Sequence, residues 1–168
     1  AKLTEQAGIE CFPDISPDGS YIVFVKPSGA TSDIYLQRIG GGNPINLTEG
    51  SGTVNTHPAY SPNGEMIAFR SGREGGGIFV MGCTGESVRR LTNFGYNPSW
   101  SPDGSTLVFS TEYIEHPFSR TTESKIWTID VKEGIPAMIY AGDGVQPQWS
   151  PSGELILFWG LPKGTGKR

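Results

Sequence analysis

Residues 97–110 of the chain read NPSWSPDGSTLVFS, and three other stretches of its 168 residues repeat this pattern. The centre of the pattern is Ser-Pro-x-Gly, which begins at Ser16, Ser61, Ser101 and Ser150, at spacings of 45, 40 and 49 residues. Self-similarity at a period of about 40 to 50 residues is typical of folds built from repeated units. The fold can therefore be deduced from one unit.

Each unit carries the same residue types at fixed distances from its turn proline. A second proline lies four residues before the turn proline, and a large apolar residue lies two before it. An isoleucine or leucine lies five residues after it, and a phenylalanine lies seven after it. In chain order the turn prolines are Pro17, Pro62, Pro102 and Pro151, and the other positions are Pro13, Pro58, Pro98 and Pro147; Ile15, Tyr60, Trp100 and Trp149; Ile22, Ile67, Leu107 and Ile156; Phe24, Phe69, Phe109 and Phe158. Agreement at this many positions indicates a structural repeat.

The unit has the local signals of turns and strands. Proline presets φ for a tight turn, Asp or Asn suits the next position, and glycine supplies a positive φ. The Ile-x-Phe that follows places two apolar side chains on one face of a strand. A third strand is predicted at 33–38, 77–82 and 125–130, and a fourth ends near 46–48, 90–92 and 138–140. Four antiparallel strands in about 40 to 50 residues match a β-propeller blade, and blades must stack to bury both faces.

The repeat predicts an all-β chain that forms a single partial propeller over residues 1–168. Three complete blades are predicted at 12–48, 57–92 and 97–140, with the first half of a fourth at 146–168 and the last strand of a preceding blade at 1–5. Counting from Pro151, the third strand of the last blade would start at Lys167 or Arg168. Two interpretations stay open, a fragment of a larger ring and a ring completed by a second copy. Open blade edges favour homo-oligomers through strand pairing.

The composition excludes several classes of function. A formal net charge of −4 and a pI near 5.2 argue against a nucleic-acid surface, which needs clustered Lys and Arg. No apolar run is long enough to cross a membrane. Cys11 and Cys83 are the only cysteines, and both are expected to be free. His57 and His116 have no cysteine or carboxylate cluster at ligand spacing, so neither a metal nor another cofactor is expected.

Strand direction predicts which loops share one end of the blades. The second-to-third loops, at Pro27–Ser32, Gly72–Gly76 and Glu112–Ser124, lie at the same end as the fourth-to-first connections. Long loops on a rigid scaffold often carry binding, although a tolerated insertion would look the same. The candidate binding residues in these loops are Arg73, Glu74, Tyr113, His116, Phe118 and Arg120.

The residue before each strand-one proline differs from blade to blade, although the proline beside it does not. These residues are Phe12, His57, Asn97 and Gln146, and strand direction places them near the mouth of the central channel, at the end with the long loops. Two interpretations stay open: these positions contact a ligand and determine its specificity, or they are unconstrained exposed positions. Together with the loop residues, these four residues form the candidate binding face.

No catalytic pattern stands out. A Gly-x-Ser-x-Gly nucleophile turn is absent, and the glycine-rich stretch 72–77 links two strands rather than preceding a helix that would bind phosphate. The C-terminal GTGKR lacks the spacing of a phosphate-binding loop. The chain is therefore expected to be no enzyme by itself.

The repeat resembles the TolB-like (WD-repeat-like) propeller family, best from HPAYSPNGEMIAFRS through GGGIFVMG and SVRRLT to NPSWSPDGSTLVFS. It departs from the family at Gly82, where an aspartate usually follows the third strand. The resemblance implies a bacterial, often periplasmic or otherwise extracytoplasmic, module that binds proteins. Similar propellers also accompany catalytic domains in prolyl-oligopeptidase-like peptidases and membrane-anchored Ser/Thr kinases.

Two functions are therefore expected from the sequence. The first is a non-catalytic scaffold that binds a protein or peptide partner through its loop face. The alternative is a sensor or gating propeller of a larger enzyme whose catalytic part lies outside this chain. Neither expects nucleic-acid binding or membrane insertion by this segment.

Overall fold

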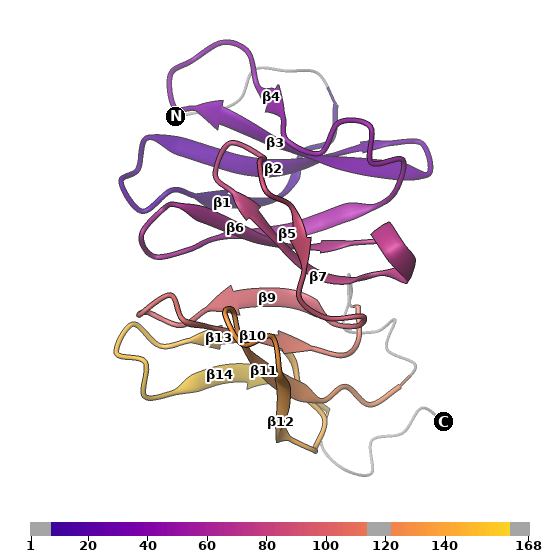
Figure 1. Ribbon diagram of the computed structural model, residues 1–168, viewed down its shortest axis with the longest axis vertical. Coiled ribbons are helices and arrows are strands. Elements are labelled where there is room, and N and C mark those ends of the chain that lie inside the picture. Colours follow the sequence, from indigo (N-terminus) through magenta and orange to yellow (C-terminus); the bar gives the residue numbers. More distant parts are fainter. Residues whose placement is uncertain (1–7, 114–121, 162–168) are drawn as a thin grey trace.

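The computed structural model describes residues 8–113 and 122–161, and these form antiparallel sheets with one short 3-10 turn. Each sheet takes its strands in chain order (Figure 1). The first holds β1 (Cys11–Ile15), β2 (Tyr21–Ser28), β3 (Thr31–Arg38) and β4 (Ile45–Asn46), and the second holds β5 (Asn55–Tyr60), β6 (Met66–Ser71), β7 (Gly77–Gly82) and β8 (Arg89–Arg90). The third holds β9 (Tyr96–Trp100), β10 (Thr106–Ser110), β11 (Ile126–Asp130) and β12 (Pro136–Tyr140), and the fourth holds β13 (Val145–Trp149) and β14 (Ile156–Trp159).

The sheets stack in sequence, from the first blade at one end of Figure 1 to the fourth at the other. Between the first two blades, Val23 and Val25 pack against Ile67 and Phe69 of the next blade. The second interface repeats this arrangement with a core that includes Ile78, Leu107 and Phe109. The predicted all-β partial propeller is therefore confirmed. The predicted strand at 1–5 lies outside the described residues.

The Ser-Pro-x-Gly turn is closed by a repeated set of hydrogen bonds. In the third blade the hydroxyl of Ser101 donates to Asp103 Oδ1 at 2.6 Å and accepts from the backbone N–H of Thr106 at 3.0 Å. The N–H of Gly104 donates to the carbonyl of Ser101 at 2.9 Å. Because the serine closes both sides of the turn, its side chain fixes the register of β9 against β10.

Successive turns also lie close to one another. A Cβ placed on Gly104 would lie 3.6 Å from Cδ of Pro62 in the preceding blade. The same contact recurs between Gly64 and Pro17 and between Gly153 and Pro102. The turn proline of one blade therefore lies next to the turn glycine of the following blade.

The first strand of each blade lines the central channel and is its innermost strand; these strands are β1, β5, β9 and β13. Each contains a β-bulge that the sequence analysis did not predict. In the second blade Thr56 pairs with Arg70 and Ala59 pairs with Ala68, so that His57 and Pro58 together face the single residue Phe69. The register shifts at the same place in the other three blades. Proline suits a bulge because it has no N–H to contribute to the ladder. The repeated proline and the repeated phenylalanine therefore face each other across the same bulge.

The prediction of a loop over Pro27–Ser32 is wrong, because the observed loop is shorter. Strand β2 continues to Ser28 and β3 begins at Thr31, so only Gly29 and Ala30 connect them. Gly29 has φ 62°, which permits the tight turn. The second loop contains the 3-10 turn η1 (Arg73–Gly75).

Neither Cys11 nor Cys83 forms a disulfide with the described residues, and both are partly buried against the first interblade core. In the part of the chain that the structure describes, no helix has the length and apolar character needed to cross a membrane.

Candidate binding site at the mouth of the channel

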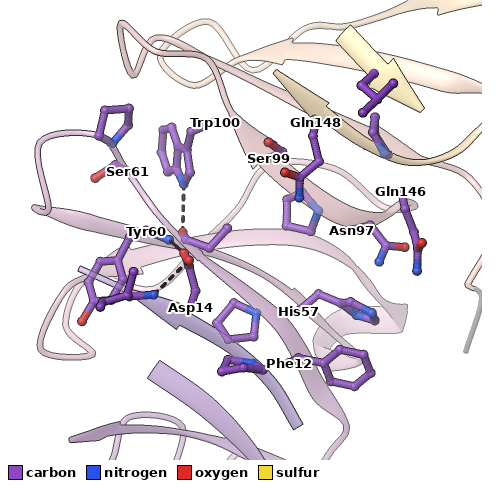
Figure 2. Close-up of a pocket in the computed structure, with 18 of the residues that line it drawn as sticks. Phe12, Asp14, His57, Tyr60, Ser61, Asn97, Ser99, Trp100, Gln146 and Gln148 are labelled. Carbon is purple, nitrogen blue, oxygen red and sulfur yellow. Dashed lines mark hydrogen bonds between the residues drawn. The ribbon is translucent and has the colours of Figure 1, made fainter. Parts of the chain in front are cut away.

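The four innermost strands and their turns line one open cavity of about 720 Å³. Its walls include the bulge prolines and the residues that precede them, together with deeper side chains from the same strands. Figure 2 shows Phe12, His57, Asn97 and Gln146 gathered at one side of this cavity, although they come from four different blades. The structure thus brings together the four variable positions that the repeat singled out.

These four residues share an unusual backbone conformation. Their φ angles are 50°, 51°, 55° and 50° in chain order, and only Glu74 and Ser87 join them as non-glycine residues of positive φ in the described part of the chain. Non-glycine residues in this region are strained by about 1–3 kcal/mol each. Glycine would adopt the conformation without strain, as it does at Gly19 and Gly64. Each bulge therefore carries a side chain at a position where glycine would be less strained.

Aromatic rings form one half of the mouth. The rings of Phe12 and His57 are 4.1 Å apart between centroids, and Tyr113 meets His57 edge-on at 5.6 Å. The hydroxyl of Thr56 lies 3.1 Å from Nδ1 of His57, which orients the imidazole. Tyr96 continues the row, 5.6 Å from Tyr113. Phe12 and Tyr113 offer flat apolar surface to a ligand in this half, whereas His57 is buried against them.

Carboxamides form the other half. Asn97 and Gln146 project side by side in Figure 2, with Ser99 and Gln148 one step deeper on the same strands. The Oδ1 atom of Asn97 is buried and has no hydrogen-bond partner among the described residues. Gln146 Oε1 accepts a hydrogen bond of 2.8 Å from Trp159 Nε1. Each carboxamide combines a donor with an acceptor, which is the pattern of a peptide group.

Deeper in the cavity, Asp14 joins the first blade to the second. Its Oδ2 accepts a 2.7 Å hydrogen bond from the N–H of Tyr60, and its Oδ1 accepts one of 2.9 Å from the N–H of Ile15. Burial raises the pKa of the Asp14 carboxyl above its ordinary 3.8, and the two N–H donors oppose the shift. Burial also raises the pKa of the Tyr60 phenol, with the nearby Cys83 and Asp14 adding to the shift. The hydrogen bond from the Tyr60 N–H to Asp14 therefore links β5 to β1 in the wall of the channel.

The loop candidates lie in different places. Arg73 and Glu74 sit in η1 and do not line the cavity; Arg73 instead lies over the ring of Phe69, 5.8 Å from its centroid, and burial lowers the pKa of its guanidinium. Arg90 fixes this loop by donating to the carbonyls of Glu74 at 2.9 Å and Gly76 at 2.7 Å. His116, Phe118 and Arg120 lie outside the described residues.

Several wall residues were missed by the sequence analysis. Asp14, Ser99 and Gln148 all stand three residues before a turn proline, two after the variable position. Their fixed offset from the turn proline was the signal in the sequence, although the bulge between them and the variable position interrupts simple alternation of the strand. The contribution of Trp159 had no such signal, because it depends on pairing across the sheet.

Stacked antiparallel sheets, three with four strands and one with two, surround an open channel with variable side chains at its mouth, and this arrangement defines a β-propeller. A family model described as the TolB beta propeller domain matches residues 1–158. The chain belongs to this family.

Individual relatives differ in what they are called. The chain is 32% identical over 155 residues to the uncharacterized protein Atu1656 of Agrobacterium fabrum, covering 85% of this chain and 52% of that protein. It is 28% identical over 175 residues to dipeptidyl-peptidase 5 of Porphyromonas gingivalis, covering 94% of this chain and 24% of that one. The chain thus spans about half of the first relative and about a quarter of the second.

The fold is also similar to that of TolB from Acinetobacter baumannii. The TM-score is 0.73 at 23% identity, covering 94% of this chain and 39% of that one.

Proposed function

We propose that this chain is a non-catalytic propeller module that binds a segment of a protein or peptide partner at the mouth of its channel. The supporting observation is the set of four strained residues Phe12, His57, Asn97 and Gln146, whose side chains meet at one cavity. Strain retained at the same position of every blade is expected where the side chains contact a ligand. Membership in the TolB propeller family agrees with a role in protein binding.

A selection experiment tests this proposal. A random dodecapeptide display library is selected against the chain and against a variant carrying F12G, H57G, N97G and Q146G. Glycine keeps the positive φ at each bulge while removing the side chain. We expect peptides that bind the wild type and lose at least about tenfold in affinity on the variant.

The matched control is S87G, which replaces another non-glycine residue of positive φ, near the exposed β7–β8 turn. It should leave peptide affinity unchanged. Failure to recover any peptide that distinguishes the wild type from the mouth variant would contradict the proposal.

The second candidate is a sensor or gating propeller within a larger enzyme. It is favoured by the similarity to dipeptidyl-peptidase 5, of which this chain would cover 24%. The gene around this segment discriminates between the two: a Gly-x-Ser-x-Gly hydrolase domain or a kinase signature beside it would favour the second candidate. In both cases the mouth contacts polypeptide.

The remaining features of the proposal follow from the family and the open sheets. An extracytoplasmic location, bacterial as in the relatives, is expected from the family resemblance. Self-association is expected through the fourth blade, where Leu155 and Leu157 are 70% and 76% exposed. We propose no nucleic-acid or metal ligand.

A further inference from the structure

The two halves of the channel mouth differ in chemistry, and this difference indicates what kind of segment they bind. We propose, on the basis of the function proposed above, that the mouth recognises an uncharged stretch of polypeptide with an aromatic side chain. The aromatic ring packs on Phe12, whose own ring lies against the buried His57. The adjacent backbone lies against Asn97 and Gln146, donating an N–H to Asn97 Oδ1 and accepting a hydrogen bond from Gln146 Nε2.

The charge of the wall supports an uncharged ligand. Among the described residues that line the cavity there is no lysine, arginine or glutamate, and Asp14 is the one carboxylate. Both oxygens of Asp14 already accept backbone N–H groups, from Tyr60 and Ile15. A negatively charged ligand side chain would leave water without a Lys or Arg partner among these wall residues, and a positively charged one would meet only the Asp14 carboxylate, which two backbone N–H groups already stabilise.

The hydrogen bonds within the mouth assign a direction to each carboxamide. Asn97 Oδ1 is a buried acceptor without a donor among the described residues, and such an atom is stabilised when a donor reaches it. Gln146 Oε1 already accepts from Trp159 Nε1 at 2.8 Å, which leaves its NH₂ group to donate. One accepting and one donating carboxamide together match the N–H and C=O groups of an extended backbone.

Contacts among the side chains of the aromatic half fix its rings in an orientation that suits a flat ligand group. Phe12 and His57 are tilted at 41° with centroids 4.1 Å apart, and Thr56 contacts the imidazole at 3.1 Å. Aromatic rings prefer offset or edge-on partners of their own kind, and a buried ring also removes a large apolar area from water. An aromatic side chain of the ligand extends the row that Phe12, His57 and Tyr113 already form.

Small neutral amides test the inference directly. N-acetyl-tryptophanamide carries one aromatic ring and two peptide groups, and it is titrated into the ¹⁵N-labelled chain by NMR. N-acetyl-lysinamide and the amide of N-acetyl-glutamate are the charged comparisons, and maltotriose is the neutral sugar comparison. We expect shifts at the side-chain NH₂ groups of Asn97 and Gln146, with the tryptophan amide binding at least about fivefold tighter than either charged amide. Between about 50 and 500 mM NaCl its affinity should change less than about twofold.

Two near-isosteric variants separate the roles of the carboxamides. N97D keeps an acceptor for the ligand N–H and should retain affinity within about twofold, whereas Q146E loses the donor and should weaken binding about fivefold or more. N63D makes the same Asn-to-Asp change in an exposed turn and should have no effect. F12A should reduce the preference for the tryptophan amide over N-acetyl-alaninamide.

Several outcomes would overturn the inference: equal or tighter binding of a charged amide, a tenfold salt dependence, larger shifts with maltotriose, or N97D and Q146E losing affinity equally. Failure here is distinguishable from failure of the proposed function. If selected dodecapeptides depend on the mouth but are charged, the proposed function stands and this inference fails. If no peptide depends on the mouth, both fail.

Discussion

The indole Nε1 of Trp100 donates a hydrogen bond of 2.9 Å to the carbonyl oxygen of Ala59, and so joins the innermost strands of two successive blades. Trp149 occupies the same position in the next blade, but its buried Nε1 has no hydrogen-bond partner among the described residues. The two tryptophans therefore differ in one interaction while sharing their place in the repeat.

This pair predicts unequal effects of the same substitution. W100F keeps an aromatic ring but loses the hydrogen bond to Ala59, so the free energy of unfolding should fall by about 1–2 kcal/mol. W149F removes a buried donor that lacks a partner, so it should cost clearly less than W100F or even stabilise the fold. Urea denaturation followed by circular dichroism measures both. Equal losses for the two variants would argue against a role for the Trp100–Ala59 bond.

The bulge conformation predicts which side chains the mouth tolerates. N97G should change the free energy of unfolding by less than about 1 kcal/mol, because glycine accepts φ 55° without strain. N97V should cost about 1–3 kcal/mol, since a β-branched residue fits poorly at positive φ. T106V introduces valine on the neighbouring strand β10, where extended backbone suits it, and serves as the control. A tolerated N97V would show that the bulge can relax.

Asp14 predicts a specific pH dependence. Its pKa is raised in the folded chain, so the folded state favours the protonated carboxyl. The stability of the wild type relative to D14N should be greatest below pH 3.8 and should decline as the pH rises through the folded-state pKa. Urea unfolding of both proteins across pH 3 to 7 measures the difference.

Asp18 supplies the control of opposite sign. Hydrogen bonds from Ser16 and Ser20 lower its pKa, so the stability of the wild type relative to D18N should be present above pH 3.8 and lost as the pH falls. Parallel pH profiles for D14N and D18N would contradict this account of both carboxyls.

The exposed face of the fourth blade predicts where the proposed self-association would occur. Leu157 is 76% exposed, whereas Val23, Ala68 and Val108 at the same repeat position are fully buried by the next blade. L157E should lower the apparent mass measured by light scattering at increasing concentration, because it places a charge on the surface that would be covered. I135E adds the same charge at a 71% exposed residue in the β11–β12 turn and should not. A wild type that stays monomeric at every concentration would contradict the prediction.

Much of the fold could be predicted from the sequence because its signals are local. Proline, aspartate and glycine at Pro102, Asp103 and Gly104 specify a turn by their own backbone preferences, and Ile-x-Phe specifies the strand that follows. The loop at Pro27–Ser32 was predicted too long, because the strands on both sides of it extend into this range. Pro27 instead stays within β2, and the chain reverses at Gly29.

The site could be predicted only in part. Variation before Pro58 and its equivalents located the mouth, but the bulge that directs these side chains depends on pairing with a strand that comes later in the chain. The bridge from Asp14 to Tyr60 joins residues 46 apart, and no local pattern encodes it. Contacts between blades are set by stacking, which the repeat implies without specifying individual atoms.

The contact between the turn proline of one blade and the turn glycine of the next has an evolutionary consequence. Pro17, Pro62 and Pro102 all present the same surface to Gly64, Gly104 and Gly153. After an in-frame duplication or deletion of one whole repeat, the turn proline of each blade would therefore still meet the turn glycine of the blade that follows it. Genes for such rings can lengthen or shorten by unit steps without inventing a new interface, and descendants of one ancestor can differ in blade number.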